Sequence, residues 1–320
     1  MKKLLFVYNP TSGAGTIVKK IPQIIKIFSN ANYQTDLYPT KAKFDGKDKV
    51  IADYKEYDRI VVAGGDGMLN ELVNAIMSID ADIEVGYIPT GTTNDFAHTH
   101  KISKKILKSA KIAVSDNLQK LDVGQFDDTY FSYVAATGFG TKASYATDQK
   151  TKKRWKFLAY IAYALKDLNK KSLTAMCRKM TIVADNEIIE GEFIFAGISN
   201  SLSIAGMKNL TDKHASLTDG MLEGLFIPLP KGIKEWNQLV QAFLNRNYEG
   251  SPLLKFIKAQ NFEITCDPTD WTLDGEHGSS HEKVVIKAIP QALNIALPRR
   301  KAKKIKKAIK KREKQNRKLQ

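Results

Sequence analysis

The sequence has few cysteines and no long apolar run, and each absence narrows the class of protein. Cys177 and Cys266, the two cysteines among 320 residues, lie far apart and form no C-x-x-C pair, so neither a disulfide framework nor a zinc site is signalled. The longest apolar run, Phe157–Leu165, is about half of the ~18 residues that a membrane span needs. This composition predicts a cytoplasmic protein that does not cross a membrane.

Negative charge is scarce at one end of the chain. Residues 299–320 carry thirteen Lys or Arg against one acid, so this tail holds +12 of the net charge of +16. Ala302, Ile305 and Ile309 form a thin apolar stripe at helical spacing within it. The composition leaves two interpretations open: a solvated end, or a helix that lies on an anionic bilayer.

Short β-forming runs alternate with amphipathic stretches in the first ninety residues. The expected strands are Lys2–Tyr8, Tyr33–Tyr38, Tyr57–Ala63 and Ile83–Ile88. This alternation predicts an α/β fold with an open, mostly parallel sheet. In such sheets ligands bind beyond the carboxyl ends of the strands.

Glycine-rich loops follow three of these expected strands. They are Asn9–Gly15 (NPTSGAG), Gly64–Gly67 (GGDG) and Pro89–Asp95 (PTGTTND). None is a G-x-x-x-x-G-K-[ST] P-loop or a G-x-G-x-x-G dinucleotide fingerprint. Structural turns would explain any one of them, but three at equivalent strand ends favour the close approach of an anion such as phosphate to the backbone.

Asp66 lies in the second loop, directly before an expected helix. Gly64, Gly65 and Gly67 are able to direct backbone N–H groups at an anion, and a helix N-terminus favours negative charge. A carboxylate at the same place repels a polyphosphate unless a cation lies between them. We therefore expect Asp66 to hold Mg²⁺ through water, although a helix N-cap is the simpler explanation for an isolated aspartate.

Two motifs together carry a specific family resemblance. G-G-D-G-x-L-N-E at Gly64–Glu71 is followed about twenty residues later by P-x-G-T-x-N-D-F-A at Pro89–Ala97. The pair resembles the bacterial diacylglycerol kinase and related soluble lipid kinase family, whereas NAD kinases and phosphofructokinases share only the first type of loop. The resemblance continues in Leu121–Gly124, Ala215–Leu222 and Leu273–His277, and covers nearly the whole chain apart from the basic tail.

The resemblance implies two domains and a tail. Residues 1–122, completed by residues of about 291–298, would form a nucleotide-binding α/β domain like those of phosphofructokinase and NAD kinase. Residues 123–290 would form a lipid-substrate domain, an antiparallel β-sandwich interrupted by a helix at 152–169, with the active site in the cleft between the domains. Residues 299–320 are the basic tail.

The same resemblance implies an ATP-dependent kinase. Glu276, in LDGEH, would be the general base that accepts the proton of the substrate hydroxyl. Asp66 and Asp122 would hold the catalytic Mg²⁺ through water, and Asp95 would support them. ATP would contact Asn9, Pro10, Thr11, Ser12, Gly13, Thr40, Gly65, Asp66, Gly67, Met68, Leu69, Asn70, Glu71 and Thr92.

A second, structural Mg²⁺ is implied by the motif ASLTDGML. Asp219 would bind it through its side chain, and Ser216 and Met221 through their backbone carbonyls. By itself, TDG indicates only a turn.

Two residues depart from the family pattern: Met68 stands where threonine is usual, and Ala14 where some relatives carry lysine, so both bear on activity and nucleotide preference.

We expect a lipid kinase that makes phosphatidic acid from diacylglycerol. It would associate peripherally with the cytoplasmic face of an anionic membrane through its basic tail, without specific nucleic-acid binding, and a homodimer stays open. The alternatives are a kinase for another lipid alcohol, such as a sphingoid base or a phosphatidylglycerol-like lipid, then an NAD kinase, then a catalytically weak anion-binding regulatory protein.

Overall fold

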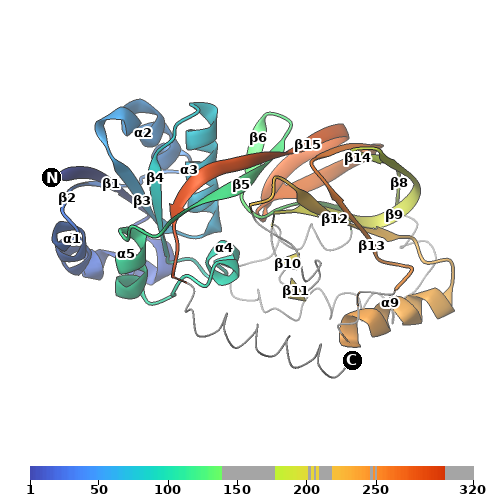
Figure 1. Cartoon of the computed structure of the whole chain (residues 1–320). Coiled ribbons are helices and arrows are strands. Elements are labelled where there is room, and N and C mark those ends of the chain that lie inside the picture. The colour runs from blue at the N-terminus through green and yellow to red at the C-terminus, as the bar shows by residue number, and fades with distance from the viewer. Residues whose placement is uncertain are drawn as a thin grey trace, which may run out of the picture.

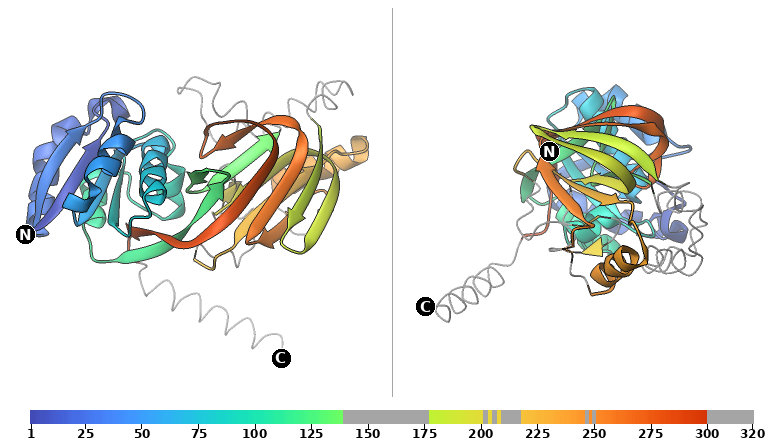
Figure 2. Two further views of the ribbon diagram at one scale, coloured as in Figure 1. Left: turned by 90° about the horizontal axis from the view of Figure 1, so that it is seen from above. Right: turned by 90° about the vertical axis from the view of Figure 1, so that its right-hand side faces the viewer.

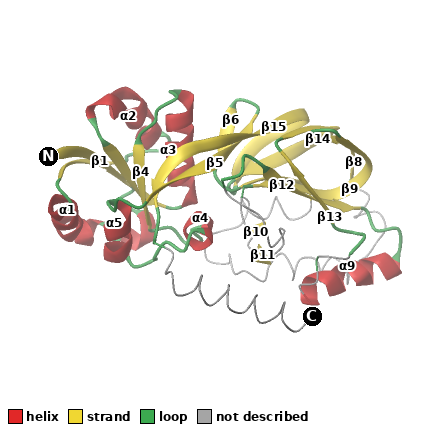
Figure 3. Ribbon diagram, in the orientation of Figure 1, coloured by secondary structure: helices red, strands yellow, loops and turns green. Residues whose placement is uncertain are grey.

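A computed structural model describes residues 1–138, 177–200, 203–204, 207–208, 218–245, 248 and 251–299. The helix expected at 152–169 and the tail beyond Arg299 lie outside these ranges. Parallel strands flanked by helices lie at one end of the described chain and antiparallel strands at the other (Figures 1 and 3). Within the same ranges no helix has the length and apolar content needed to cross a membrane.

Four parallel strands form the N-terminal part of the sheet, in the order β2-β1-β3-β4. They are β1 (Lys2–Tyr8), β2 (Tyr33–Pro39), β3 (Arg59–Gly64) and β4 (Glu84–Pro89). Their bounds agree with the expected strands to within two residues, and the prediction of an α/β fold is confirmed.

Helices cover both faces of these strands. Leu4 and Phe6 of β1 belong to one buried cluster, and Leu5 and Val7 to another, because successive strand residues point to opposite faces. The first cluster includes side chains of α1 and α5, and the second includes side chains of α2 and α3. The helices are α1 (Ile21–Asn30), α2 (Asp45–Asp53), α3 (Asp66–Ser78), the short α4 (Asp95–Thr99) and α5 (Ile106–Ala113).

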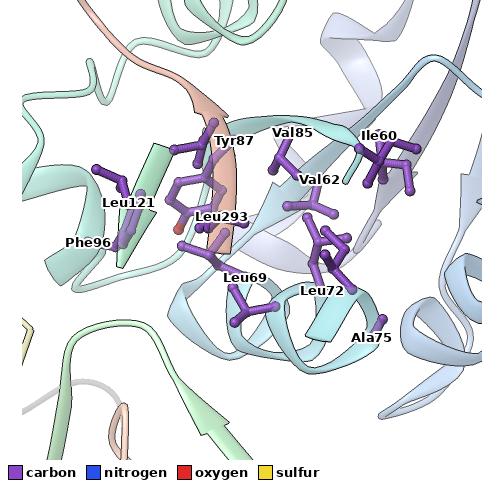
Figure 4. Close-up of a cluster of buried hydrophobic side chains, with 14 of the residues drawn as sticks. Ile60, Val62, Leu69, Leu72, Ala75, Val85, Tyr87, Phe96, Leu121 and Leu293 are labelled. Carbon is purple, nitrogen blue, oxygen red and sulfur yellow. The ribbon is translucent and has the colours of Figure 1, made fainter. Parts of the chain in front are cut away.

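The second cluster links α3 to the sheet (Figure 4). Leu69 and Leu72 of α3 lie against Val62 of β3 and Val85 of β4. Leu293, which comes from a strand more than 200 residues later in the chain, belongs to the same cluster. The core of the parallel part therefore includes a distant segment.

That segment is strand β15 (Glu276–Ala296), which joins the two parts of the sheet. It pairs in parallel with β4, where Ile295 lies beside Val85, and antiparallel with β5 (Leu118–Phe126) and β14 (Asn261–Leu273). Figure 2 shows it, in orange to red, extending from the parallel strands into the antiparallel ones. The end of β15 thus lies on the parallel part, while the expected domain limits stay predictions.

Two long strands organise the antiparallel part. Strands β9 (Glu187–Ser199) and β14 each pair with both β7 (Val134–Gly138) and β8 (Arg178–Ala184), which closes a ring of four strands. Other described elements are β6 (Thr129–Phe131), β10 (Ser203–Ile204), β11 (Met207–Lys208), β12 (Leu222–Pro228), β13 (Lys255–Ala259), α9 (Ile233–Asn245) and the 3-10 helices η1 (Ser12–Gly15), η2 (Val18–Lys20) and η3 (Tyr54–Glu56).

Candidate active site

The three glycine-rich loops lie together at the carboxyl ends of β1, β3 and β4. Thr90 donates its backbone N–H to the carbonyl of Gly64 at 2.9 Å and its hydroxyl to Ser12 Oγ at 2.8 Å. Asn9 donates its backbone N–H to the carbonyl of Ala63 at 3.0 Å. Each loop is therefore hydrogen-bonded to a neighbouring strand end or loop.

Close backbone packing explains two of the glycines. Gly13 has φ +59°, and a Cβ there would lie 2.7 Å from the carbonyl oxygen of Thr90. A Cβ on Gly91 would lie 2.5 Å from the Cα of Gly65. Larger residues would push the loops apart, so these glycines are required by the fold itself, before any ligand is considered.

Asp66 is the first residue of α3, and its carboxylate lies beside the start of α4. Gly65 holds the N-cap position and α3 has no side-chain cap, so the N-cap explanation for Asp66 is wrong. Its Oδ1 accepts the backbone N–H of Phe96 at 3.3 Å, and the backbone N–H of Asp95 also donates to this carboxylate. Asp66 therefore links α3 to α4.

Three carboxylates, those of Asp66, Asp95 and Asp274, interact in this region. Burial, and then the charge of Asp95, raises the pKa of Asp66 to about 6. Burial also raises the pKa of Asp95, and the charge of Asp274 adds to that shift, although the Tyr133 hydroxyl donates to Asp95 Oδ2 at 3.3 Å. A bound cation would relieve this repulsion.

Asp274 is the most heavily hydrogen-bonded of the three. Its Oδ2 accepts the backbone N–H and the hydroxyl of Ser132 and the side-chain amide of Asn70, at 2.7, 2.8 and 3.0 Å. Its Oδ1 accepts the backbone N–H groups of Tyr133 and Val134, at 2.9 and 3.0 Å. One buried carboxylate thus ties α3 and the segment before β7 to the turn between β14 and β15.

That turn places Glu276. Asp274 and Gly275, with φ +52° and +90°, form a two-residue connection of the kind that favours Asp-Gly, and Glu276 is the next residue. Its Oε1 would lie 3.4 Å from a Cβ on Gly67 in the first turn of α3, and its Oε2 accepts from Lys43 Nζ at 3.1 Å. A residue of the C-terminal hairpin is thereby brought to the GGDG loop.

Asp122 makes different contacts from Asp66 and Asp95. The residue is 2% exposed, and its carboxylate accepts the backbone N–H of Gly220 at 2.7 Å and that of Gln291 at 2.8 Å. Asp219, beside Gly220, pairs with Lys258 at 2.7 Å and accepts the N–H of Met221 at 3.3 Å. Ser216 lies outside the described residues.

Several residues expected to contact ATP have other partners for their side chains. Leu69 is fully buried in the core, and its backbone N–H donates to the carbonyl of Gly65 at 3.3 Å. Met68 packs against Gly64 and Gly46 and against the same core, and so projects no polar group where the family usually has threonine. Glu71 accepts the backbone N–H of Phe44.

The other residues expected to contact ATP differ in hydrogen bonding and in exposure. Asn9 Oδ1 accepts the backbone N–H and the hydroxyl of Thr11, at 2.9 and 2.8 Å, which closes the first loop on itself. Thr40 donates its backbone N–H to the carbonyl of Tyr8 at 2.9 Å. Thr92 is exposed in the third loop, and Pro10 is partly buried in the first.

Sequence reasoning missed Asp274, Tyr133 and Lys43. The Asp-Gly pair at 274–275 is a hairpin signal that could have drawn attention to Asp274. No local pattern distinguishes Tyr133 or Lys43, because their importance comes from contacts with residues remote in the chain.

Comparison with known proteins identifies relatives of this chain. A model of the diacylglycerol kinase catalytic domain matches residues 3–126. The diacylglycerol kinase of Bacillus subtilis (strain 168) is 28% identical over 308 residues, which is 95% of this chain and 99% of that protein. The diacylglycerol kinase of Staphylococcus aureus (strain JH9) is 30% identical over 283 residues, which is 87% of each chain.

A solved structure shows the same fold. The crystal structure of a diacylglycerol kinase from Bacillus anthracis str. Sterne matches with a TM-score of 0.71 at 20% identity, over 93% of this chain and 97% of that one. The family model and the relatives above make the protein a lipid kinase. The chain belongs to the diacylglycerol kinase family, as its two motifs predicted.

The raised pKa of Asp66 predicts how stability depends on pH without metal or nucleotide. Because the folded pKa of about 6 lies above the unfolded value, ionisation of Asp66 destabilises the folded state as pH rises from about 4 to 6. The free energy of unfolding of Asp66→Asn should therefore be about 3 kcal/mol higher than that of wild type at pH 8, with little difference near pH 4. Urea unfolding in EDTA measures this, with the exposed Asp128→Asn as control. Equal stability at pH 8 would contradict the shift.

The contacts of Asp274 predict a large loss of stability when its charge is removed. Asp274→Asn keeps the size but replaces an acceptor oxygen with an amide donor, which leaves buried N–H groups unpaired. We expect the free energy of unfolding to fall by about 2 to 4 kcal/mol at pH 7. Glu276→Gln, at a side chain that is 53% exposed, is the matched variant and should unfold like wild type. Similar stability of the two variants would refute the role of Asp274.

Proposed function

We propose that this lipid kinase transfers the γ-phosphate of ATP to the hydroxyl of diacylglycerol, which yields phosphatidic acid. The observation that carries the proposal is the meeting of Glu276 with Gly67, which puts a candidate base beside the candidate phosphate loop. The named relatives favour diacylglycerol over the other lipid alcohols that the sequence leaves open.

In this proposal ATP lies against the three loops at the strand ends. The residues proposed to contact it are those expected from the sequence, at 9–13, 40, 65–71 and 92, although the side chains of Met68 and Leu69 pack in the core. Gly65 and Gly67 have room for a ligand, since a Cβ on either would make contacts no closer than 3.4 Å. The N-terminus of α3 at Asp66 favours the negative charge of phosphate.

Magnesium fits the cluster of acids by charge. Asp66 and Asp95 repel one another while buried, and a divalent ion would relieve that repulsion. In the described part of the chain no three His, Cys, Asp or Glu side chains are placed to ligate one ion, so water would complete the coordination. When bound, Mg²⁺ supplies positive charge that stabilises the transferring phosphoryl group. Asp122, proposed to hold the ion with Asp66 through water, accepts the backbone N–H groups of Gly220 and Gln291.

Glu276 would start the transfer by accepting the proton of the lipid hydroxyl. The hydroxyl oxygen then forms a bond to the γ-phosphorus while the bond from that phosphorus to the β,γ-bridging oxygen breaks, and ADP leaves. Lys43 donates to Glu276, and this hydrogen bond must weaken when the substrate hydroxyl binds there. The reacting groups would lie between the parallel part and the antiparallel part, with residues 123–290 as the proposed lipid-binding β-sandwich.

The proposed enzyme works at a membrane surface. Residues 299–320 would hold it at an anionic leaflet on the cytoplasmic side, because each basic residue near such a surface is attracted to it. A homodimer stays a prediction. Turnover by the wild-type protein in the assay below distinguishes this enzyme from the alternative of a catalytically weak anion-binding protein.

Glu276→Gln tests the base. The change removes the proton acceptor and keeps the size, so we expect turnover of diacylglycerol to fall by roughly 10² or more while the KM for ATP changes little. Transfer of radiolabelled phosphate from ATP to lipids in anionic mixed micelles measures it. Glu282→Gln, an exposed glutamate on the same strand, is the control. A panel with a sphingoid base and phosphatidylglycerol identifies the substrate. Near-normal turnover by Glu276→Gln would remove Glu276 from this role.

The second Mg²⁺ at Asp219 must compete with Lys258. The Lys258 ammonium lies 2.7 Å from the Asp219 carboxylate and would repel a divalent ion there. If Asp219 binds Mg²⁺, Lys258→Met should melt at a temperature that rises more steeply with added Mg²⁺ than that of wild type. Asp219→Asn combined with Lys258→Met should remove the part of the rise that Lys258→Met adds, and leave the part due to Mg²⁺ bound at Asp66. Melting that is independent of Mg²⁺ in Lys258→Met would exclude this site.

A further inference from the structure

Four consecutive exposed residues connect β2 to α2: Lys41, Ala42, Lys43 and Phe44, here called the 41–44 tip. Phe44 is 51% exposed, which makes it one of the large apolar side chains in the described ranges that face solvent. A single exposed apolar residue is common on protein surfaces. The backbone conformation of Phe44 and the contacts of its neighbours distinguish it from an ordinary exposed apolar residue.

Phe44 is held in a strained conformation. Its φ of +68° is left-handed, which is unfavourable for a bulky residue and persists only where surrounding contacts enforce it. Its N–H donates to the Glu71 carboxylate, and its carbonyl accepts the N–H of Asp48 at 3.0 Å. Asp45 accepts the hydroxyl of Tyr38 at 2.6 Å and the N–H of Lys41 at 2.7 Å. The outward position of the ring is therefore built into the fold.

The tip contacts the candidate base. Lys43 Nζ lies 3.1 Å from Glu276 Oε2 and 5.1 Å from the centre of the Phe44 ring. Any lipid hydroxyl that reaches Glu276 must come close to this ring and this ammonium. The tip thus lies at the approach to the position where the reaction is proposed.

The charged side chains of the tip itself, Lys41 and Lys43, are both basic and both exposed. The carboxylates beside the tip have partners of their own: Asp45 accepts from Tyr38 and the backbone of Lys41, and Glu71 accepts the backbone N–H of Phe44. Glu276, which is 53% exposed, accepts from Lys43. An exposed aromatic ring flanked by lysines matches the interface of an anionic bilayer, where rings lie at the headgroups and ammonium groups meet lipid phosphates.

We propose that the 41–44 tip docks on an anionic bilayer, with the ring of Phe44 inserted at headgroup depth. Docking would bring Glu276 to the level at which the hydroxyl of a membrane lipid lies. The role of Glu276 here rests on the proposed function, but insertion of the ring does not. The proposal adds to the tail a second membrane contact, placed at the active site.

Phe44→Trp reports insertion directly. With vesicles of phosphatidylcholine and phosphatidylglycerol, we expect a blue shift of the emission of Trp at this position and its quenching by lipids brominated near the headgroup, after subtraction of the parent protein. Ile188→Trp, at a residue that is 66% exposed on β9, is the matched control and should show neither. Vesicle binding without quenching of the Phe44→Trp signal, or equal quenching of both variants, would overturn the proposal.

Phe44→Gly tests the consequence for catalysis. Glycine accepts the left-handed conformation, so the variant should melt no lower than wild type. We expect the ratio of its rate on vesicle-embedded diacylglycerol to its rate on a dispersed short-chain analogue to fall about tenfold, since burial of a ring is lost. A raised KM for ATP with an unchanged ratio would instead make Phe44 a nucleotide contact and overturn membrane docking. If the intact protein phosphorylates no lipid, the proposed function fails, while the quenching measurement still decides the docking.

Discussion

The carboxylate of Asp274 is the constraint on which the candidate site depends. Five donors from α3 and from residues 132–134 converge on it, and the residue is 5% exposed. Only an ionised carboxylate has enough acceptor capacity for so many donors, which explains aspartate at this position. Because Asp274 begins the turn that leads to Glu276, its hydrogen bonds hold the C-terminal hairpin against the GGDG helix.

Around Asp274, the site combines tight backbone packing with repulsion between buried carboxylates. Gly13 and Gly91 let three loops approach to distances that any Cβ would prevent. Beside them, Asp66 and Asp95 are buried close together and resist ionisation. The fold thus maintains an arrangement that is unfavourable without a ligand, as expected of a site completed by a cation and a polyphosphate. The strained Phe44 at the edge of the same region follows the same pattern.

The sequence identified part of the site but not its connections. Paired motifs drew attention to Asp66, Asp95 and Glu276, and the structure brings the first two together and the third to Gly67. Asp122 was expected to hold the catalytic metal through water, which stays a prediction; the structure adds that its carboxylate accepts the backbone N–H groups of Gly220 and Gln291. These two partners lie 98 and 169 residues away, so no local pattern could reveal them.

The sequence by itself determined the strands of the parallel part and the membership of the family. Apolar runs buried on both faces and glycine loops at strand ends are local signals, read within about ten residues. The resemblance already implied that residues of about 291–298 complete the parallel part. Tertiary structure alone decided that they pair with β4, that β9 and β14 share partners, and that Lys43 meets Glu276. These contacts depend on which buried surfaces fit together across the whole chain. Side-chain identity at one position cannot encode that fit, because it is a property of the packed molecule.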